Sequence, residues 1–302
     1  MAVAPRPRPV VSVPLISVPL INVPSTDGVD VAVHDLGGDD ALPTLLVSHA
    51  TGFHAHCYVP IAEALASRYH SIGIDHRGHG RTAIDPAWVV DWSRFGDDAI
   101  AVARHLAVDR PITGFGHSMG ATALIMAAHR NPALFDRLVL FEPIAHPPAT
   151  SPRDTDEVHR VPIVRGALRR RRTFPSFDAA VDNYRSKPPM ASMTPAVLRN
   201  YVEHGFREAV DADGNPVVEL RCAPELEAGI FTVARDNGVW ALLPEIETPC
   251  VVISGQVEES QPSAQAEAIA ERFPHGDYVQ LDHQTHFGPF SHPDEVADLI
   301  AR

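Results

Sequence analysis

The sequence has 302 residues, of which 45% are hydrophobic and 21% charged, so it is long enough for one large α/β domain with a substantial insert. A formal net charge of −13 and the lack of a basic helix argue against nucleic-acid binding, and we expect a small-molecule partner. Three scattered cysteines, Cys57, Cys222 and Cys250, exclude a disulfide framework or a zinc site built on cysteine and fit a reducing compartment.

We expect residues 1–24 to form a separate N-terminal arm. The stretch 10–21 is apolar, but Pro14, Pro19 and Pro24 interrupt this part of the chain, and no convincing cleavage site follows. We therefore expect an extended edge segment or a loose arm rather than a signal peptide. No apolar run reaches the ~20 residues of a membrane-spanning helix. The predicted location is the cytoplasm, without a membrane span.

Short apolar segments then alternate with helical patterns from residue 25 to residue 146. Strands are expected at 30–34, 43–48, 71–75, 111–115 and 136–142, and helices at 59–69, 91–106 and 119–130. Such alternation with short connections predicts a parallel sheet covered by helices on both faces. Ligands bind beyond the carboxyl ends of the strands in sheets of this kind.

The alternation stops near His146, and residues 147–243 read as an inserted helical lid. Helices are expected near 155–172, 176–186, 194–208 and 224–235, with a polar hairpin at 211–216. Arg165 and Arg169–Arg172 fit a solvated helix face, with contact to an anionic substrate or partner as the alternative. The core resumes at 244–302, with strands at 249–255 and 278–281 and helices at 263–273 and 293–301.

The stretch around Ser118 carries the strongest chemical signal. Gly116-His117-Ser118-Met119-Gly120 fits the pattern G-x-S-x-G, with an apolar strand before it and an Ala-rich helix after it. This pattern is typical of a sharp strand-to-helix turn that exposes the serine at a helix N-terminus. Ser118 is the predicted nucleophile.

A serine nucleophile needs a base, and His286 is the predicted one. It follows the last expected strand and precedes the closing helix, so a loop can bring it back over the serine. His283, nearer the strand end, is the alternative.

The acid that orients the base should follow a strand end between the serine and the base. Glu258 lies three residues beyond Gly255, which closes an expected strand, and is the first choice. Glu142, at the end of an earlier strand, is the main rival, and Glu259 fits a wider turn. All three satisfy the required order along the chain.

Two backbone amides are expected to stabilise a developing oxyanion. Met119 follows the nucleophile and supplies one amide; Thr51, in the loop after the strand at 43–48, is the expected source of the second.

Together these motifs resemble the α/β-hydrolase fold superfamily over residues 25–302. The matching stretches are 49–53, 75–80, 116–120 and the C-terminal His286. The resemblance implies a mostly parallel eight-stranded sheet, a lid inserted after the sixth strand, and a triad of Ser118, a carboxylate and the histidine, without a cofactor. It also implies that Asp75 and Arg77, in the D-x-R-G-x-G turn, are structural. The chain departs from the common pattern at Ala50, where glycine is usual, and in offering Glu258 where aspartate is commoner.

The function expected from these residues is a serine hydrolase, esterase- or lipase-like. It would cleave a small-to-medium, mostly hydrophobic carboxylic ester or thioester through an acyl-enzyme. A carbon–carbon bond hydrolase of vinylogous diketones would use the same triad, and a cofactor-free perhydrolase or oxygenase is a lesser alternative. A non-catalytic binder of small ligands is the alternative from another class. No metal is expected, because His54 and His56 lack further ligands nearby in sequence.

Overall fold

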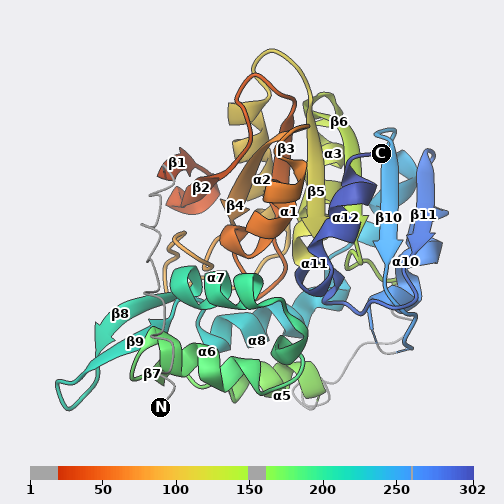
Figure 1. The fold of residues 1–302 in the computed structure, drawn as a ribbon. Coiled ribbons are helices and arrows are strands. Elements are labelled where there is room, and N and C mark those ends of the chain that lie inside the picture. The colour runs from red at the N-terminus through yellow and green to blue at the C-terminus, as the bar shows by residue number, and fades with distance from the viewer. Residues whose placement is uncertain (1–19, 149–160, 260) are drawn as a thin grey trace, which may run out of the picture.

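The computed structural model describes residues 20–148, 161–259 and 261–302 (Figure 1). Its main sheet has eight strands in the order β1-β2-β4-β3-β5-β6-β10-β11. Strand β2 runs antiparallel to β1 and β4, and the pairs from β4 to β11 are parallel. The strands are β1 (Leu20–Pro24), β2 (Asp30–Gly37), β3 (Thr44–Ser48), β4 (His70–Asp75), β5 (Ile112–His117), β6 (Phe135–Phe141), β10 (Cys250–Ser254) and β11 (Gly276–Gln280). The predicted fold class, a mostly parallel eight-stranded α/β-hydrolase sheet, is confirmed.

The predicted N-terminal arm overlaps this sheet at its edge. Residues 20–24 form β1 and pair with β2 along their whole length, so this part of the arm is an edge strand. Residues 1–19 lie outside the described part of the chain, and the expectation of a loose arm there is untested.

Helices cover both faces of the sheet and bury two apolar clusters against it. In β3 the side chain of Leu46 faces the cluster with α2 and α3, while Leu45 and Val47 face the one with α1 and α12. This alternation follows from the two-residue period of a strand. The core helices are α1 (Val59–Leu65), α2 (Ser93–Leu106), α3 (Met119–Arg130), α10 (Ser263–Ala270), α11 (Gly288–Ser291) and α12 (Pro293–Ile300).

The inserted lid is helical, as predicted, but it also contains a small sheet that was not expected. Its helices are α5 (Pro162–Leu168), α6 (Phe177–Arg185), α7 (Pro195–Gly205), α8 (Pro224–Val233) and α9 (Val239–Leu242). A three-stranded antiparallel sheet runs between them in the order β7 (Thr173–Phe174), β9 (Pro216–Leu220), β8 (Phe206–Val210). The predicted extension of a helix to residue 208 is therefore wrong, and residues 155–160 of the first predicted lid helix lie outside the described residues.

The boundaries of α7 have local causes. Thr194 caps its start, with Oγ1 accepting a hydrogen bond from the amide of Val197 at 3.3 Å. At its end, a Cβ on Gly205 would lie 3.1 Å from the ring of His54 in the core, so this close approach favours glycine. The chain then continues as the strand β8.

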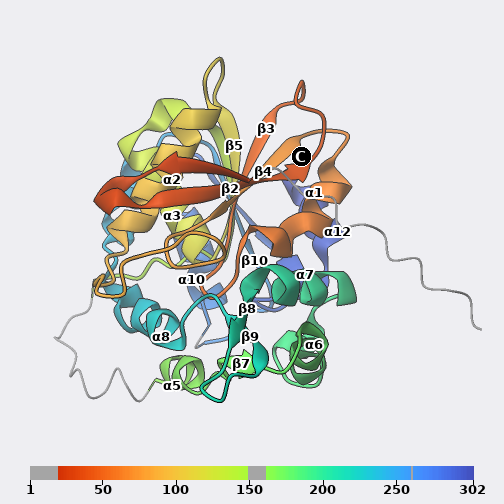
Figure 2. The same cartoon turned by 90° about the vertical axis from the view of Figure 1, so that its left-hand side faces the viewer.

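The lid lies beyond the carboxyl ends of the parallel strands. Figures 1 and 2 show α5, α6, α7 and α8 gathered at one end of the sheet, the end toward which the arrow of β10 points. Phe53, in the loop after β3, packs against Tyr201 of α7 with ring centroids 5.3 Å apart. Trp92, just before α2, donates a hydrogen bond to the carbonyl of Ile230 in α8. The lid and the strand-end loops therefore form one continuous region.

Asp75 and Arg77 of the D-x-R-G-x-G turn hold the turn itself in place. The carboxylate of Asp75 is buried and accepts hydrogen bonds from the amides of Ala55 and Arg81. The fully buried guanidinium of Arg77 forms an ion pair with Asp98 at 2.7 Å. These contacts give both residues the structural role that the sequence pattern implied.

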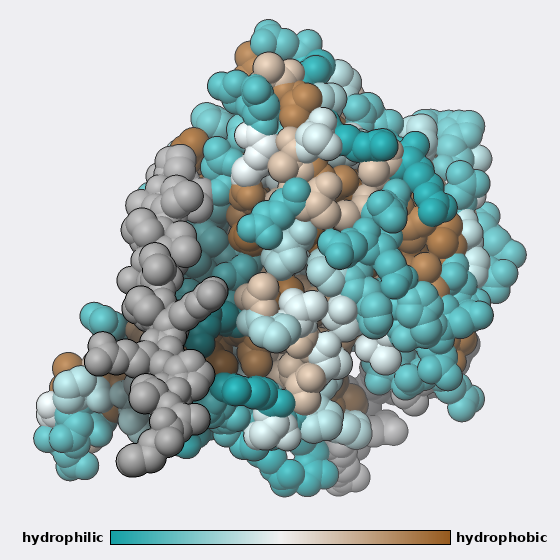
Figure 3. Space-filling view, in the orientation of Figure 1, coloured by the Kyte–Doolittle hydropathy of each residue, from teal (hydrophilic) through white to brown (hydrophobic). Residues whose placement is uncertain are grey.

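The surface is mixed in character. On the face shown in Figure 3, hydrophobic residues occur in small separate areas among hydrophilic ones. Among the described residues, no helix has both the length and the apolar character needed to cross a membrane.

Candidate active site

The backbone of Ser118 has a conformation that L-residues rarely adopt. Its φ and ψ are 55° and −115°, and its amide donates a hydrogen bond to the carbonyl of Phe141 at 2.9 Å. Strained residues of this kind concentrate at functional sites. The side chain sits at the junction of β5 and α3, as the G-x-S-x-G pattern predicts.

Both glycines of the motif are required by close backbone approaches. A Cβ on Gly116 would lie 2.4 Å from Cα of Ala121, and one on Gly120 would lie 2.1 Å from the carbonyl oxygen of Ser48. Since such contacts involve backbone, no side-chain rearrangement would relieve them.

The amide of Met119 is available at the start of α3. The first hydrogen bond of the helix runs from the amide of Thr122 to the carbonyl of Ser118 at 3.1 Å, so the amides before Thr122 have no acceptor within the helix. This is the geometry expected of the first oxyanion donor.

The structure brings Glu142, the rival acid from the sequence, against His286. Oε2 of Glu142 lies 2.6 Å from Nδ1 of the histidine, and Oε1 accepts the amide hydrogen of Gly255 at 2.9 Å. The carboxylate is 1% exposed and the imidazole 22% exposed. Glu142 also has a positive φ of 45°, and only Asp27, Ser118 and Glu142 share this feature among the described non-glycine residues. The hydrogen bond at Nδ1 leaves Nε2 of His286 to exchange a proton with a nucleophile.

Glu258 and Glu259, by contrast, lie exposed in the loop after β10. The amide of Glu258 donates to Oγ of Ser263, which places this residue near the start of α10. No contact joins either carboxylate to His286 in the described part of the chain, and the first choice of Glu258 is therefore replaced by Glu142 below. The physical reason is that the loop after β10 turns outward at Gly255 and uses its backbone amide to hold Glu142.

His283, the alternative base, also lies elsewhere. Its Nε2 is 2.7 Å from Oε2 of Glu295, and its side chain is 57% exposed. The geometry places His286, and not His283, on the buried carboxylate of Glu142.

In the loop after β3, the amides on either side of Thr51 are hydrogen-bonded. The amide of Ala50 donates to Oη of Tyr58 at 3.1 Å, and that of Gly52 donates to Nε2 of His79 at 3.1 Å. Between them, the amide of Thr51 has no hydrogen-bond partner among the described residues. An amide left free between two bonded ones has the geometry expected of the second oxyanion donor.

His117 occupies the first x position of the G-x-S-x-G motif, directly before the serine. It connects three loops, a role that was not identified from the sequence. Its Nε2 donates to the carbonyl of His286 at 2.9 Å, so Nδ1 is left to accept the hydroxyl hydrogen of Tyr58 at 2.9 Å. The same Tyr58 oxygen accepts the amide hydrogen of Ala50. Burial, with a smaller contribution from His286, holds the pKa of His117 well below 6.5. The neutral ring thus links the turn at Ser118 to the loop of His286 and, through Tyr58, to the loop after β3.

Arg170 of the lid reaches the same region. It forms an ion pair with Glu227 at 2.5 Å and donates hydrogen bonds to the hydroxyls of Tyr184 and Tyr201. A Cβ on Gly52 would lie 2.5 Å from Oε1 of Glu227, so this pair sits directly on the loop that carries the free amide. The expected solvated face is therefore wrong for Arg170, although Arg165, Arg169, Arg171 and Arg172 are exposed. Within the run Arg169–Arg172, the sequence carries no signal that separates Arg170 from its exposed neighbours.

Aromatic rings line the junction of core and lid. Phe53 packs against Phe287 and Phe290 with ring centroids 5.9 Å and 4.6 Å apart, and against Tyr201 on the opposite side of the junction. Phe53 and Phe287 are partly exposed and offer apolar surface, whereas Phe290 is fully buried and packs against His117 of the serine turn.

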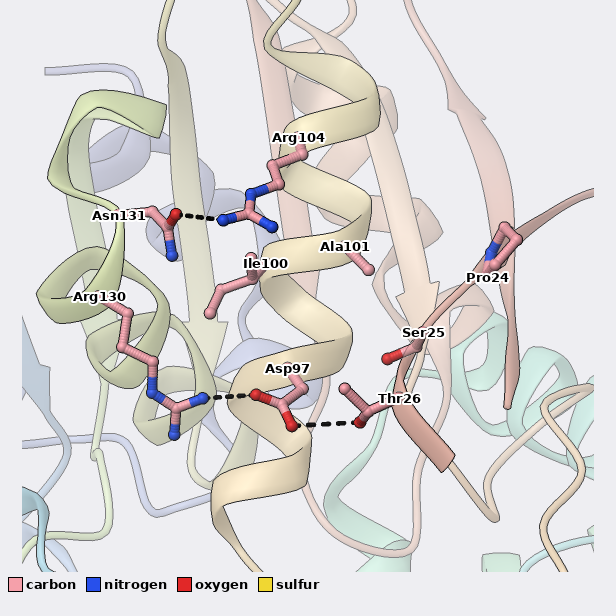
Figure 4. Close-up of a pocket in the computed structure, with 9 residues that line it drawn as sticks. All are labelled: Pro24, Ser25, Thr26, Asp97, Ile100, Ala101, Arg104, Arg130 and Asn131. Atoms are coloured by element: carbon pink, nitrogen blue, oxygen red, sulfur yellow. Dashed lines mark hydrogen bonds and ion pairs between the residues drawn. The ribbon is translucent and has the colours of Figure 1, made fainter. Parts of the chain in front are cut away.

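A separate pocket of about 370 Å³ lies at the N-terminal edge of the molecule (Figure 4). In it, Asp97 of α2 bridges Arg130 at the end of α3 and the hydroxyl of Thr26, while Arg104 donates to Asn131. None of its lining residues belongs to the loops of Ser118, Glu142 or His286. These polar contacts link α2 to the end of α3 and to the segment at Thr26.

Buried neutral histidines make the loops around the site sensitive to acid. Burial is the main cause that lowers the pKa of His76 to about 3 and that of His79 to about 4 from 6.5. Nε2 of His79 accepts the amide of Gly52, so a proton there would break this bond. In the unfolded chain both rings would take up protons near pH 6.5, and the unfolded state then binds more protons than the folded one.

We therefore expect the free energy of unfolding to fall as the pH drops from 6.5 toward 4. Each of these histidines contributes about 1.4 kcal/mol per pH unit within its window. Urea unfolding at several pH values measures this slope, and His79→Asn should make it shallower. A free energy of unfolding that stays constant from pH 7 to pH 4.5 would contradict the prediction.

The chain matches the family model described as serine aminopeptidase, S33, over residues 39–287. It is 27% identical to a putative carbamate hydrolase RutD of Agrobacterium fabrum over 256 residues, which cover 85% of this chain and 90% of the relative. It is 26% identical to a monoglyceride lipase homolog of Monkeypox virus over 233 residues, which cover 71% and 70%. The solved structure of E-2-(acetamidomethylene)succinate hydrolase superposes with a TM-score of 0.73 at 19% identity, covering 93% of this chain and 97% of that one. The chain belongs to the serine aminopeptidase S33 family and is a hydrolase of the α/β-hydrolase fold.

Proposed function

We propose that this hydrolase cleaves a small-to-medium, mostly hydrophobic carboxylic ester or thioester through an acyl-enzyme on Ser118. The observation that carries the proposal is the hydrogen bond from His286 to the buried carboxylate of Glu142, beside a serine held at positive φ. A base oriented by a buried acid is the arrangement that a serine nucleophile requires.

In the first half of the reaction, Nε2 of His286 takes the hydroxyl proton as Oγ of Ser118 attacks the acyl carbon. The amides of Met119 and Thr51 donate hydrogen bonds to the oxyanion of the tetrahedral intermediate, which is worth on the order of 3 kcal/mol for each donor. The intermediate collapses, the bond to the alcohol or thiol breaks, and the imidazolium returns its proton to this leaving group. Glu142 stays ionised and stabilises the imidazolium.

In the second half, His286 takes a proton from water, whose oxygen attacks the acyl-enzyme. The second intermediate releases the carboxylic acid, and the proton returns to Ser118. No cofactor takes part in either half of this cycle. The names of the curated relatives, a lipase homolog and a carbamate hydrolase, support hydrolysis at an acyl carbon.

The preference for an apolar substrate rests on the ring cluster at the junction of core and lid. Phe53, Phe287 and Phe290 contact one another next to the serine turn. Apolar acyl or alcohol groups would gain ~25 cal/mol for each Å² that they bury against the partly exposed rings of Phe53 and Phe287.

The test is a rapid-mixing assay with p-nitrophenyl esters of increasing acyl length. We expect a burst of p-nitrophenol equal to one equivalent of enzyme, followed by slower turnover, with a chain-length optimum that measures the pocket. Covalent labelling of Ser118 without ester turnover would instead favour the carbon–carbon bond hydrolase. Neither labelling nor turnover would favour the non-catalytic binder.

A further inference from the structure

Two imidazoles and one carboxylate gather beside the loop that carries His286. They belong to His283, His292 and Glu295, each of which offers one nitrogen or oxygen ligand atom, and these atoms lie within 4.8 Å of one another. His283 follows β11, whereas His292 directly precedes α12 and Glu295 lies in the first turn of this helix. The cluster therefore joins the two ends of the segment that contains His286.

The hydrogen bonds of His292 fix which of its nitrogens is free. Oγ of Ser291 donates its single hydrogen to the carbonyl of Phe287 at 3.1 Å. The same oxygen lies 2.8 Å from Nδ1 of His292, so it must accept a hydrogen from that nitrogen. Nε2 of His292 is consequently unprotonated in the neutral ring. Metal-binding histidines characteristically donate their second ring N–H in this way.

The carboxylate of Glu295 is also held in position. Nε2 of Gln284, a side chain that is 1% exposed, donates to Oε2 of Glu295 at 3.0 Å. This anchored oxygen completes a set of two nitrogens and one oxygen.

We propose that His283, His292 and Glu295 bind a divalent transition-metal ion of the Zn²⁺ type, which fastens the His286 loop to α12. Two imidazoles and a carboxylate are ligands that zinc takes readily, with water in the fourth position. His283 would present the lone pair of Nε2 by carrying its proton on Nδ1, and the metal would then replace its direct hydrogen bond to Glu295. Mg²⁺ prefers a shell of oxygens and should not bind here.

Another histidine–glutamate pair, His275 and Glu247, provides a comparison for the proposed metal site. Nε2 of His275 lies 3.3 Å from Oε2 of Glu247, and both side chains are exposed. Within the described part of the chain, this pair has no second imidazole close enough to complete a metal-binding group. His275→Ala is therefore a control that removes an exposed histidine without touching the proposed site.

The experiment is a titration of untagged, metal-free protein with ZnCl₂, followed by isothermal calorimetry and by the midpoint of thermal unfolding. We expect one Zn²⁺ per chain and a rise in the midpoint, since an ion that binds only the folded state stabilises it. MgCl₂ should leave the midpoint unchanged. This readout does not depend on hydrolysis, so it is independent of the proposed function.

Variants locate the ion. His292→Ala and Glu295→Gln should abolish the zinc-dependent rise, and Ser291→Ala should weaken binding by ~10-fold or more, because it removes the acceptor that orients the ring. His275→Ala should bind as the wild type does. The proposal is overturned if the wild type binds no Zn²⁺, if Mg²⁺ raises the midpoint equally, or if His292→Ala and Glu295→Gln retain wild-type binding.

Discussion

Replacement of Ser118 by alanine is expected to lower kcat by on the order of 10⁶-fold, because no other group can form the acyl-enzyme. The fold should survive, since the change removes one oxygen and keeps the backbone hydrogen bond from residue 118 to Phe141. The measurement is kcat with the best p-nitrophenyl ester, beside circular dichroism and the thermal midpoint. Residual rates should reflect the free amides at Met119 and Thr51 and substrate binding alone.

Ser71→Ala is a matched control for this variant. Ser71 is buried in β4, and its hydroxyl has no hydrogen-bond partner among the described residues. We expect Ser71→Ala to keep kcat within about twofold of the wild type, because a small change of stability away from the site leaves its geometry intact. Substantial ester turnover by Ser118→Ala would contradict the assignment of the nucleophile.

The second large effect is expected from Glu142→Gln. The glutamine has nearly the same shape, but it removes the charge that stabilises the imidazolium and can offer an N–H to Nδ1 of His286. Nε2 would then carry the proton and could not accept one from the serine. A comparable change of tautomer in a serine protease triad lowers kcat by ~10⁴-fold, and we expect a loss of 10³-fold to 10⁴-fold here.

Glu258→Gln is the discriminating control, because this residue was the first choice from the sequence. The side chain of Glu258 is exposed in the loop after β10. We therefore expect the kcat of Glu258→Gln to stay within about twofold of the wild type. Full activity of Glu142→Gln together with a large loss in Glu258→Gln would mean that the loop after β10 folds back onto His286 during the reaction. Full activity of both variants would remove the carboxylate from the triad.

Much of the fold is predictable because buried parallel strands and amphipathic helices leave strong local patterns. The runs that become β3 and β10 are short and mostly apolar, as is typical of strands covered on both faces. The turn at Ser118 is predictable because close backbone approaches, to Ala121 and to Ser48, require glycine two residues before and two residues after the serine.

The acid is not predictable from local patterns. Glu142 and Glu258 both follow buried strands that end at one edge of the sheet, and either choice fits the order along the chain. What separates them is the order of strands, in which β6 lies next to β5, and the positive φ of Glu142. The sequence around Glu142 carries no motif that marks its positive φ.

Contacts within the lid are likewise set by tertiary structure. The pairing of β8 with β9 ends α7 at Gly205, although the residues that follow are compatible with a longer helix. Arg170 and Glu227 are 57 residues apart and meet only because α5 and α8 pack together over the loop at Gly52. Spacing along the chain carries no information about such a pair.

Covalent labelling with a fluorophosphonate tests most directly the claim that Ser118 is a nucleophile activated by His286 and Glu142. Intact-mass measurement and peptide mapping should find one adduct per chain, on Ser118. Labelling should be absent in Ser118→Ala and much slower in Glu142→Gln, and it should be unchanged in Glu258→Gln. A wild-type protein that stays unlabelled, or that carries the adduct on another residue, would contradict this claim.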